Sequence, residues 1–337
     1  MNSNIEIFLS TPKIILIWLS IWLRIGDHVI LHQLKQAIVL FTQYSFLLFE
    51  LIYIIVVWGD LDEVSEASYL FFTQASVCYK VAVFVINKNK LKKLLEFMMV
   101  DIFASQSTVH DGYARTHVSP LITVCIQNLA ENEERSILTL GSLTHSHCFF
   151  RMPVSQHIFS QYMIGYLYQI ISVYISALLF FAVDSTTLSM IIFGCAQIEI
   201  IIDKIKKVKH ISKCFRFIEL LENTYHANIF FQLSGTVAII CIIGLRISIT
   251  EPDSVQFYSM VNYMVTMMSQ LLLYCWCGNE LTTKSEDLRE WIYQCPWYEQ
   301  DSKFRSSLVI AMDCMKRPII FRAGHYIPLS RPTFVSV

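Results

Sequence analysis

Five stretches of this chain are long and apolar, and they set the strongest limit on what the chain can fold into. A helix needs about 20 apolar residues to cross a bilayer, and its backbone must hydrogen-bond internally because lipid offers no partners. Each stretch contains at most two charged residues. The stretches are residues 38–58, 69–86, 162–202, 229–249 and 257–276. The sequence therefore predicts an all-α fold, a polytopic membrane helix bundle.

The stretch from 162 to 202 is much longer than a span requires. A helix of its 41 residues would be roughly 60 Å long, about twice the thickness of the hydrocarbon layer. A hairpin would have to turn near Asp184, where the sequence has no Gly or Pro. We therefore expect one long helix that projects beyond the membrane.

Composition excludes several classes of function. The chain is 54% hydrophobic and 16% charged, against roughly 25% charged in a soluble domain. Its net charge of −1 gives no basic surface for nucleic acid. The ten cysteines lack the paired spacing of zinc sites, so no metal or other cofactor is expected. The sequence has no phosphate-binding loop, zinc-protease motif or nucleophile elbow, and we do not expect an enzyme.

The amino-terminal segment, residues 1–37, precedes the first full span. Residues 14–22 are apolar, but they are too few to cross a bilayer, and no small-residue cleavage site follows them. One helical face would carry Ile14, Ile15, Trp18, Trp22 and Ile25. We expect an interfacial helix that lies on the membrane.

Basic residues near the span ends indicate orientation, because Lys and Arg are retained in the cytoplasm. Four lysines follow the second span within residues 88–93, and six basic residues follow the long one within 204–216. The acidic loop at 59–68 contains no Lys or Arg. The amino terminus is therefore expected in the cytoplasm.

This orientation requires one more crossing between residues 104 and 160. Residues 94 and 203 both belong inside, and the long helix crosses only once. Residues 136–150 are the best candidate, although they are polar for a span.

The character of the chain changes after residue 276, where polar and aromatic residues mix without a span. We expect a packed cytoplasmic domain at 277–330. It would contain a short amphipathic helix stopped by Pro318. The apolar residues of that helix are Phe304, Leu308, Ile310, Ala311 and Met315.

An ordered set of motifs covers this carboxy-terminal region. The motifs are residues 278–288 (GNELTTKSEDL), Trp297-Tyr298, 303–308 (KFRSSL), Arg317-Pro318-Ile319, Ala323-Gly324 and Pro328-Leu329-Ser330. Two earlier motifs are residues 59–63 (GDLDE) and 195–199 (CAQIE). An ordered set of this length is far more specific than one short motif. It closely resembles the insect odorant receptor family.

The resemblance implies a bundle of nominally seven transmembrane helices with a cytoplasmic amino terminus, in the plasma membrane of sensory neurons. Such a chain would be the ligand-binding subunit of an odorant-gated cation channel, in a heterotetramer with the olfactory co-receptor. Its ligand would be a small, volatile, apolar odorant. Residues 38–276 would form the ligand-binding bundle. The third helix is atypical, and 331–337 would be the start of a truncated seventh, pore-lining helix.

The resemblance also makes residues 277–330 a cytoplasmic anchor domain that joins subunits. The residues expected in the anchor are Gly278, Asn279, Glu280, Leu281, Trp297, Tyr298, Phe304, Leu308, Arg317 and Pro318.

Three stripes of aromatic and polar residues are candidates for the ligand pocket, because an odorant pocket should be mostly apolar with a few polar groups. The first stripe is Tyr69, Phe72, Ser76 and Tyr79; the second is Tyr174, Leu178 and Phe181; the third is Tyr258, Asn262 and Thr266. Each would share one face of its helix. Helix packing alone also produces aromatic stripes.

Four ionisable residues lie within the spans, where a charge is costly and often functional. Lys80 and Arg246 lie near span ends, so we expect them to extend to the headgroups. Glu50 and Asp184 lie deeper. Asp184 is followed by Ser185, Thr186 and Thr187, and it is a candidate for gating or for structural hydrogen bonding.

Other classes of membrane protein remain as alternatives. A gustatory-type receptor channel is the nearest. A G-protein-coupled receptor is more remote, because its Glu/Asp-Arg-Tyr and Asn-Pro-x-x-Tyr motifs are absent and the loop charges are inverted. A membrane transporter is also remote, because no pair of broken helices repeats in two halves.

Overall fold

The computed structural model describes residues 3–22, 29–59, 61–99, 159–203, 211–250, 252, 254–294, 298, 301–315 and 319–336. The helices are α1 (Ser3–Trp18), α2 (Val29–Val56), α3 (Leu61–Ile86), α4 (Lys88–Met99), α7 (Phe159–Asp203), α8 (Ile211–Ile249), α9 (Val255–Gln294), α10 (Ser302–Cys314) and α11 (Arg331–Ser336). A small antiparallel hairpin of β1 (Arg322–Ala323) and β2 (Ile327–Pro328) precedes α11.

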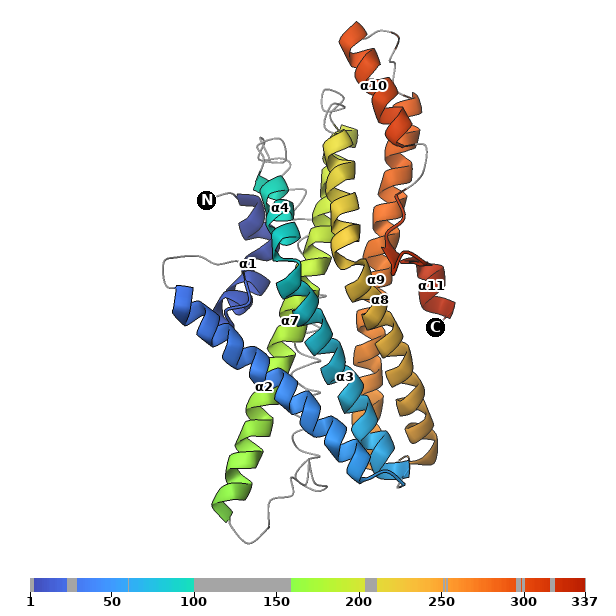
Figure 1. Cartoon of the computed structure of the whole chain (residues 1–337). Coiled ribbons are helices and arrows are strands. Elements are labelled where there is room, and N and C mark those ends of the chain that lie inside the picture. The colour runs from blue at the N-terminus through green and yellow to red at the C-terminus, as the bar shows by residue number, and fades with distance from the viewer. Residues whose placement is uncertain are drawn as a thin grey trace.

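The long helices form a bundle around α7, which packs against α1, α2, α3, α8 and α9 (Figure 1). Its middle section is buried on all sides, with Ala182, Val183 and Met190 fully inside. This burial explains why the segment is apolar all round, since a central helix has no solvent-facing stripe. The helix runs unbroken for 45 residues, so the prediction of one long helix is confirmed.

Four of the described helices are long and apolar enough to cross a membrane. They contain the segments Ile30–Val56, Glu63–Ile86, Gly165–Ile202 and Ile211–Ile249. The outer helix α2 crosses the bundle obliquely in Figure 1. Its exposed apolar side chains, including Ile30, Phe41 and Val56, suit contact with lipid. The fold is a polytopic helical membrane bundle, as predicted.

Two helices continue well beyond the predicted spans. One of them, α9, continues beyond the predicted span at 257–276 and ends at Gln294. The expected domain boundary at 277 therefore falls inside a single helix. The other, α8, begins at Ile211, eighteen residues before the predicted span. Its early part is buried at Ile211, Cys214, Phe217, Ile218 and Leu221, the spacing of one helical face. The candidate crossing at 136–150 lies outside the described residues.

The amino-terminal helix is only partly as expected. Ile14 and Trp18 are exposed, which suits a membrane surface, but α1 ends at Trp18. Trp22 is buried, and its ring centroid lies 6.3 Å from that of Phe84 in α3. Its predicted place on the exposed face is therefore wrong, because the chain turns at Ser20, where φ is 57°.

The extended ends of the helices gather at one end of the bundle, together with α4 and α10 (Figure 1). Several polar side chains fasten them. Lys90 Nζ donates to the carbonyl oxygen of Asn223 at 3.4 Å, and Lys284 Nζ in α9 pairs with Glu199 Oε1 in α7 at 3.1 Å. Lys88 Nζ donates to Gln36 Oε1 at 3.1 Å, and its burial lowers the pKa of this ammonium group.

The hairpin packs on α8. The Gly324 N–H donates to the carbonyl oxygen of His226 at 2.9 Å, and the His325 ring stacks on the His226 ring at 3.8 Å. Gly324 has a φ of 60°, and an added Cβ would lie 2.8 Å from the Phe230 ring. Only glycine fits this turn, since it needs both a left-handed backbone and close approach.

Candidate functional site

A buried ion pair joins three helices in the middle of the bundle. Lys80 Nζ in α3 lies 2.7 Å from Asp184 Oδ2 in α7, and both side chains are almost inaccessible. The Tyr274 hydroxyl in α9 donates to Asp184 Oδ1 at 2.9 Å. The Lys80 ammonium also lies 3.5 Å from the centroid of the Phe180 ring. Each carboxylate oxygen therefore has a partner, which lowers the cost of burying the charge.

Asp184 is buried inside the bundle, whereas the prediction for Lys80 is wrong. Lys80 is 1% exposed and points inward to the carboxylate instead of outward to the headgroups. Arg246 differs, because it is half-buried near the end of α8 and donates to Ser65 Oγ at 2.8 Å. Glu50 has a buried carboxylate oxygen with no hydrogen-bond partner among the described residues.

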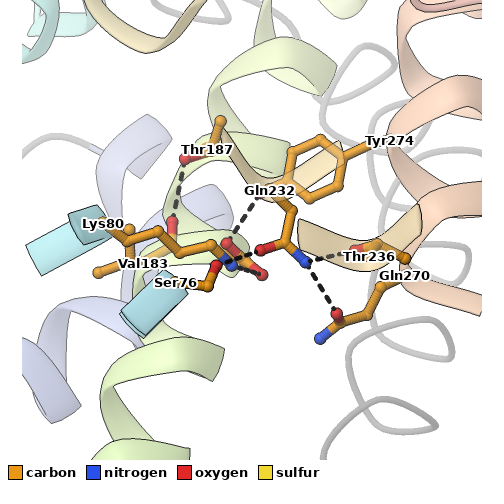
Figure 2. Close-up of polar contacts among 9 residues, drawn as sticks. Ser76, Lys80, Val183, Thr187, Gln232, Thr236, Gln270 and Tyr274 are labelled. Atoms are coloured by element: carbon orange, nitrogen blue, oxygen red, sulfur yellow. Dashed lines mark hydrogen bonds and ion pairs between the residues drawn. The ribbon is translucent and has the colours of Figure 1, made fainter. Parts of the chain in front are cut away.

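A second polar cluster lies one helical turn from the ion pair, and Figure 2 shows both. Ser76 Oγ donates to Gln232 Oε1 at 2.8 Å. Gln232 Nε2 donates to Thr236 Oγ1 at 3.2 Å and to Gln270 Oε1 at 3.3 Å. The cluster links α3, α8 and α9, and each polar group in it is paired, which a buried group requires.

A small cavity opens beside this cluster. Its volume is about 10 Å³, room for roughly one water molecule and far below the roughly 300–1,000 Å³ of pockets for drug-sized ligands. Its lining consists of Thr73, Ser76, Phe180, Gln232, Gly235, Thr236, Ile239 and Met267. Aromatic and aliphatic groups therefore face a wall of hydroxyl and amide groups.

Aromatic residues pack next to the cavity. The rings of Tyr69 in α3 and Tyr263 in α9 have centroids 5.5 Å apart, and the Tyr263 hydroxyl forms a short hydrogen bond with Thr73 Oγ1. Both tyrosines belong to a hydrophobic cluster that also contains Ile239 and Met267. Ile239 and Met267 line the cavity as well.

The predicted ligand residues are distributed unevenly around this site. Ser76 lines the cavity, and Tyr69 belongs to the adjacent hydrophobic cluster. Thr266 is buried, and it precedes the cavity-lining residue Met267 in the sequence. The remaining predicted residues do not line the cavity. Phe72, Tyr174 and Tyr258 are exposed, Tyr79 stacks on Phe231 with centroids 4.3 Å apart, and Leu178, Phe181 and Asn262 are half-buried.

Most of the cavity wall was not anticipated from the sequence. Gln232 and Thr236 are polar residues four apart on one face of α8, a spacing that the search for aromatic stripes passed over. They carried a usable signal, because buried polar residues in an apolar helix usually pair with neighbours. Phe180, Ile239 and Met267 carried none, because apolar residues are common throughout these helices.

A third polar cluster fastens α2 to the bundle. Gln74 Nε2 in α3 donates to Gln43 Oε1 in α2 at 2.9 Å, and Ser176 Oγ in α7 donates to Gln74 Oε1 at 2.8 Å. Gln43 is 1% exposed and does not line the cavity. A substitution of Gln43 is therefore a suitable control for a substitution of Gln232, because both side chains are buried and only Gln232 lines the cavity.

The predicted anchor residues that the structure describes fall on α9, on α10 and between these two helices. Leu281 and Leu308 are buried, Phe304 is half-buried and Tyr298 is exposed. Gly278 touches Leu329, and Asn279 Oδ1 accepts a hydrogen bond from the Arg331 N–H at 3.5 Å. Glu280 is half-buried in α9. Trp297, Arg317 and Pro318 lie outside the described residues.

In the part of the chain that the structure describes, no group of three His, Cys, Asp or Glu side chains is arranged to hold a metal ion. Six cysteines in this part, which include Cys275 and Cys277, are not joined in disulfide bonds. The described side chains of the site can bind a partner through packing and hydrogen bonds.

Comparison with known proteins agrees with this architecture. The family model of the 7tm odorant receptors matches residues 208–337. Odorant receptor 94a of Drosophila melanogaster is 31% identical over 106 residues, which cover 31% of this chain and 27% of that receptor. Isoform A of odorant receptor 46a from the same species is 24% identical over an alignment that covers 93% of this chain and 89% of that receptor. The odorant receptor coreceptor of Aedes aegypti is 20% identical over 40% of this chain and 27% of its own.

Solved structures show the same fold. The insect olfactory receptor OR5 from Machilis hrabei superposes with a TM-score of 0.84 at 12% identity, over 99% of this chain and 96% of that one. Its structure in complex with eugenol gives a TM-score of 0.81 over the same shares of the two chains.

These observations define a polytopic helical membrane protein with a small internal cavity. The family match, the relatives and the fold all show a similarity to the insect odorant receptor family. The chain spans only about a quarter of the length of receptor 94a and most of the length of receptor 46a.

Proposed function

We propose that this chain is the ligand-binding subunit of an odorant-gated cation channel that works with an olfactory co-receptor. The observation that carries the proposal is the small cavity between α3, α7, α8 and α9, which is lined by both apolar and polar groups. A receptor of the same fold has been solved with eugenol, a small organic ligand. The family match favours this function over a gustatory-type channel, a G-protein-coupled receptor or a transporter.

The ligand would occupy the cavity and touch Ser76, with Tyr69 and Thr266 supporting its wall. The other residues predicted from the sequence would act at a greater distance or in packing. Binding opens a channel only when the ligand has higher affinity for the open state than for the closed one. Asp184 is our candidate for the gating link, because its carboxylate connects α3, α7 and α9 next to the cavity.

The proposed channel would be a heterotetramer joined through the anchor domain. Several exposed apolar side chains on and between α9 and α10 support a partner surface there, and they are Tyr293, Tyr298, Val309 and Ile310. Exposed aromatic and aliphatic groups of this kind often mark contacts between proteins. The start of the pore helix would be α11, which follows the hairpin.

Filling the cavity tests the ligand site. We expect Ile239→Phe to raise the odorant concentration for half-maximal cation current at least about tenfold in cells that also express the co-receptor, because a larger ring would occupy the space needed by the ligand. The matched control is Leu272→Phe, which adds the same ring at a partly exposed position of α9 outside the cavity. Equal sensitivity of the two variants would contradict the proposed site, and odorant uptake without current would favour a transporter.

The orientation has its own test. The chain is proposed to lie in the plasma membrane of sensory neurons with its amino terminus in the cytoplasm, because lysine-rich segments follow the second and the long predicted spans in the sequence. An epitope tag at the amino terminus should be stained only after cells are permeabilised. Staining of intact cells would reverse the orientation and favour a G-protein-coupled receptor.

A further inference from the structure

Helix α4 carries lysines at the end of α3, where the chain leaves the second span. The span ends at Ile86, and α4 begins two residues later at Lys88. At a rise of 1.5 Å per residue, Lys92 lies roughly 9 Å beyond Ile86 along the helix. The headgroup layer on each side of the hydrocarbon is about 5–8 Å thick. Lys88 therefore lies at the level of the lipid headgroups, and the long side chain of Lys92 can reach back to that level.

The lysines of α4 lie on different sides of the helix. Lys88 and Lys92 are four residues apart, so they share one flank of α4, and we call them the lysine pair. Lys93 lies about 100° further round the helix. Lys92 and Lys93 are both exposed, whereas Lys88 is half-buried. The apolar face packs into the protein and consists of Leu91, Leu94, Leu95 and Met98.

The lysine pair has no opposite charge beside it. Lys88 Nζ donates to Gln36 Oε1 in α2 at 3.1 Å, and this amide oxygen carries no net charge. In the described part of the chain, no carboxylate forms an ion pair with Lys88 or Lys92, and this includes Glu96, the one acidic residue of α4. Burial lowers the pKa of the Lys88 ammonium group. An anion at this position would offset the cost of the half-buried charge.

The surface of α2 around Gln36 is largely apolar. Leu34 and Ile38 lie on either side of Gln36 in the sequence, and each is 56% exposed. Lys35 is exposed as well and adds a positive charge at this end of α2. An apolar helix surface that ends among cations matches the two parts of an anionic phospholipid, which are its acyl chains and its headgroup.

We propose that an anionic phospholipid binds where α4 meets α2, with its phosphate group paired to Lys88 and Lys92 and its acyl chains along the outer surface of α2. The lipid would supply the opposite charge that the lysine pair lacks and would strengthen the contact between the two helices. The inference goes beyond the proposed function, because this lipid site requires neither an odorant nor a conducting channel.

Phosphatidylserine and phosphatidylcholine with the same acyl chains are the two probes, because their headgroups differ in net charge. Each would be titrated into the full chain in a nonionic detergent, and the bound lipid would be counted by native mass spectrometry. We expect phosphatidylserine to bind at least about fivefold more tightly than phosphatidylcholine. Equal affinity would overturn the proposal. Displacement of the lipid by an equal concentration of glycerophosphoserine, the headgroup without its chains, would also overturn it, because a free anion would then suffice.

A pair of variants locates the site. Lys92→Gln removes one charge of the lysine pair at an exposed position, so the fold should be retained. We expect the affinity for phosphatidylserine to fall about fivefold, the usual share of one lysine near an anionic headgroup. The charge-conserving variant Lys92→Arg should keep the wild-type affinity.

The matched control is Lys93→Gln, which makes the same change at the neighbouring exposed residue on another side of α4. Its affinity for phosphatidylserine should stay close to that of the wild type. An equal loss of affinity in Lys92→Gln and Lys93→Gln would mean a diffuse attraction between the lysines and the lipid, and it would rule out a site at the contact between α4 and α2.

Discussion

Replacing Asp184 with Leu is expected to destabilise the folded bundle by about 3–5 kcal/mol, the usual cost of breaking one partner out of a buried ion pair. The reason is that Lys80, which is 1% exposed, would lose the carboxylate that lies 2.7 Å from its ammonium group. The Tyr274 hydroxyl would lose its acceptor as well. Chemical unfolding of the purified chain in detergent, compared with the wild type, measures this loss.

The double variant Lys80→Met, Asp184→Leu is the matched control. It removes both charges and fills their space with apolar groups, so most of the lost stability should return. In a double-mutant cycle with the single variants Lys80→Met and Asp184→Leu, we expect a coupling energy between the two residues of at least about 1 kcal/mol. If the double variant is as unstable as the sum of the two single variants, the ion pair is not a coupled unit.

The same double variant separates a structural role from gating. A chain that folds normally but needs at least about tenfold more odorant for half-maximal current would support gating through Asp184, since stability alone no longer explains the defect. Normal folding together with normal current would leave Asp184 a structural residue.

The helices of the bundle were predictable because lipid imposes a simple rule on the backbone. Every described span lies on an apolar stretch seen in the sequence, and the absence of Gly or Pro near Asp184 identified α7 as one helix. The extended ends of α8 and α9 were missed because hydropathy falls there while the helix continues. In the extended end of α9, the buried residues Leu281, Leu288 and Ile292 lie on one face of the helix. The helical periodicity of these apolar residues would have revealed the extension.

The hairpin before α11 was also not predicted as such. Its strands are two residues each, too short for an alternating pattern to be detected. The turn at Gly324 and His325 is held mainly by contacts with α8, where His226 lies ninety-eight residues before Gly324 in the sequence. Such contacts between distant segments leave no local sequence pattern.

The candidate site was predictable only in part. Asp184 could be singled out because an acidic group inside a span needs a reason to be there. Its partner could not, since Lys80 lies 104 residues away and a position near a span end suits either the headgroups or an inward ion pair. Aromatic stripes led to Tyr69 and Ser76 but also to exposed residues such as Tyr174 and Tyr258, because lipid-facing surfaces of helices carry aromatic residues too.

Replacing Gly278 with Ala is expected to destabilise the contact between α9 and the segment that leads into α11. An added Cβ would lie 2.4 Å from Leu329 Cβ and 2.8 Å from the Leu329 carbonyl oxygen. Backbone cannot move aside as a flexible side chain does, so the overpacking should cost about 1–3 kcal/mol. Leu329 is 1% exposed and its N–H donates to the Phe321 carbonyl oxygen at 2.9 Å. The strain should therefore spread to the hairpin and speed hydrogen exchange across residues 319–336.

Gly244→Ala in α8 is the matched control for this glycine. Nothing lies within 4 Å of its added Cβ, so the change should be neutral or stabilise the helix by up to about 1 kcal/mol. Exchange at 319–336 should stay at the wild-type rate in this variant and rise only in Gly278→Ala. Similar exchange in the two variants would mean that the segment entering α11 is not held by its close approach to α9, and the docking of the proposed pore helix would need another support. Faster exchange confined to the Gly278 variant, with the ion pair unaffected, would show that this end of the bundle is fastened independently of the cavity.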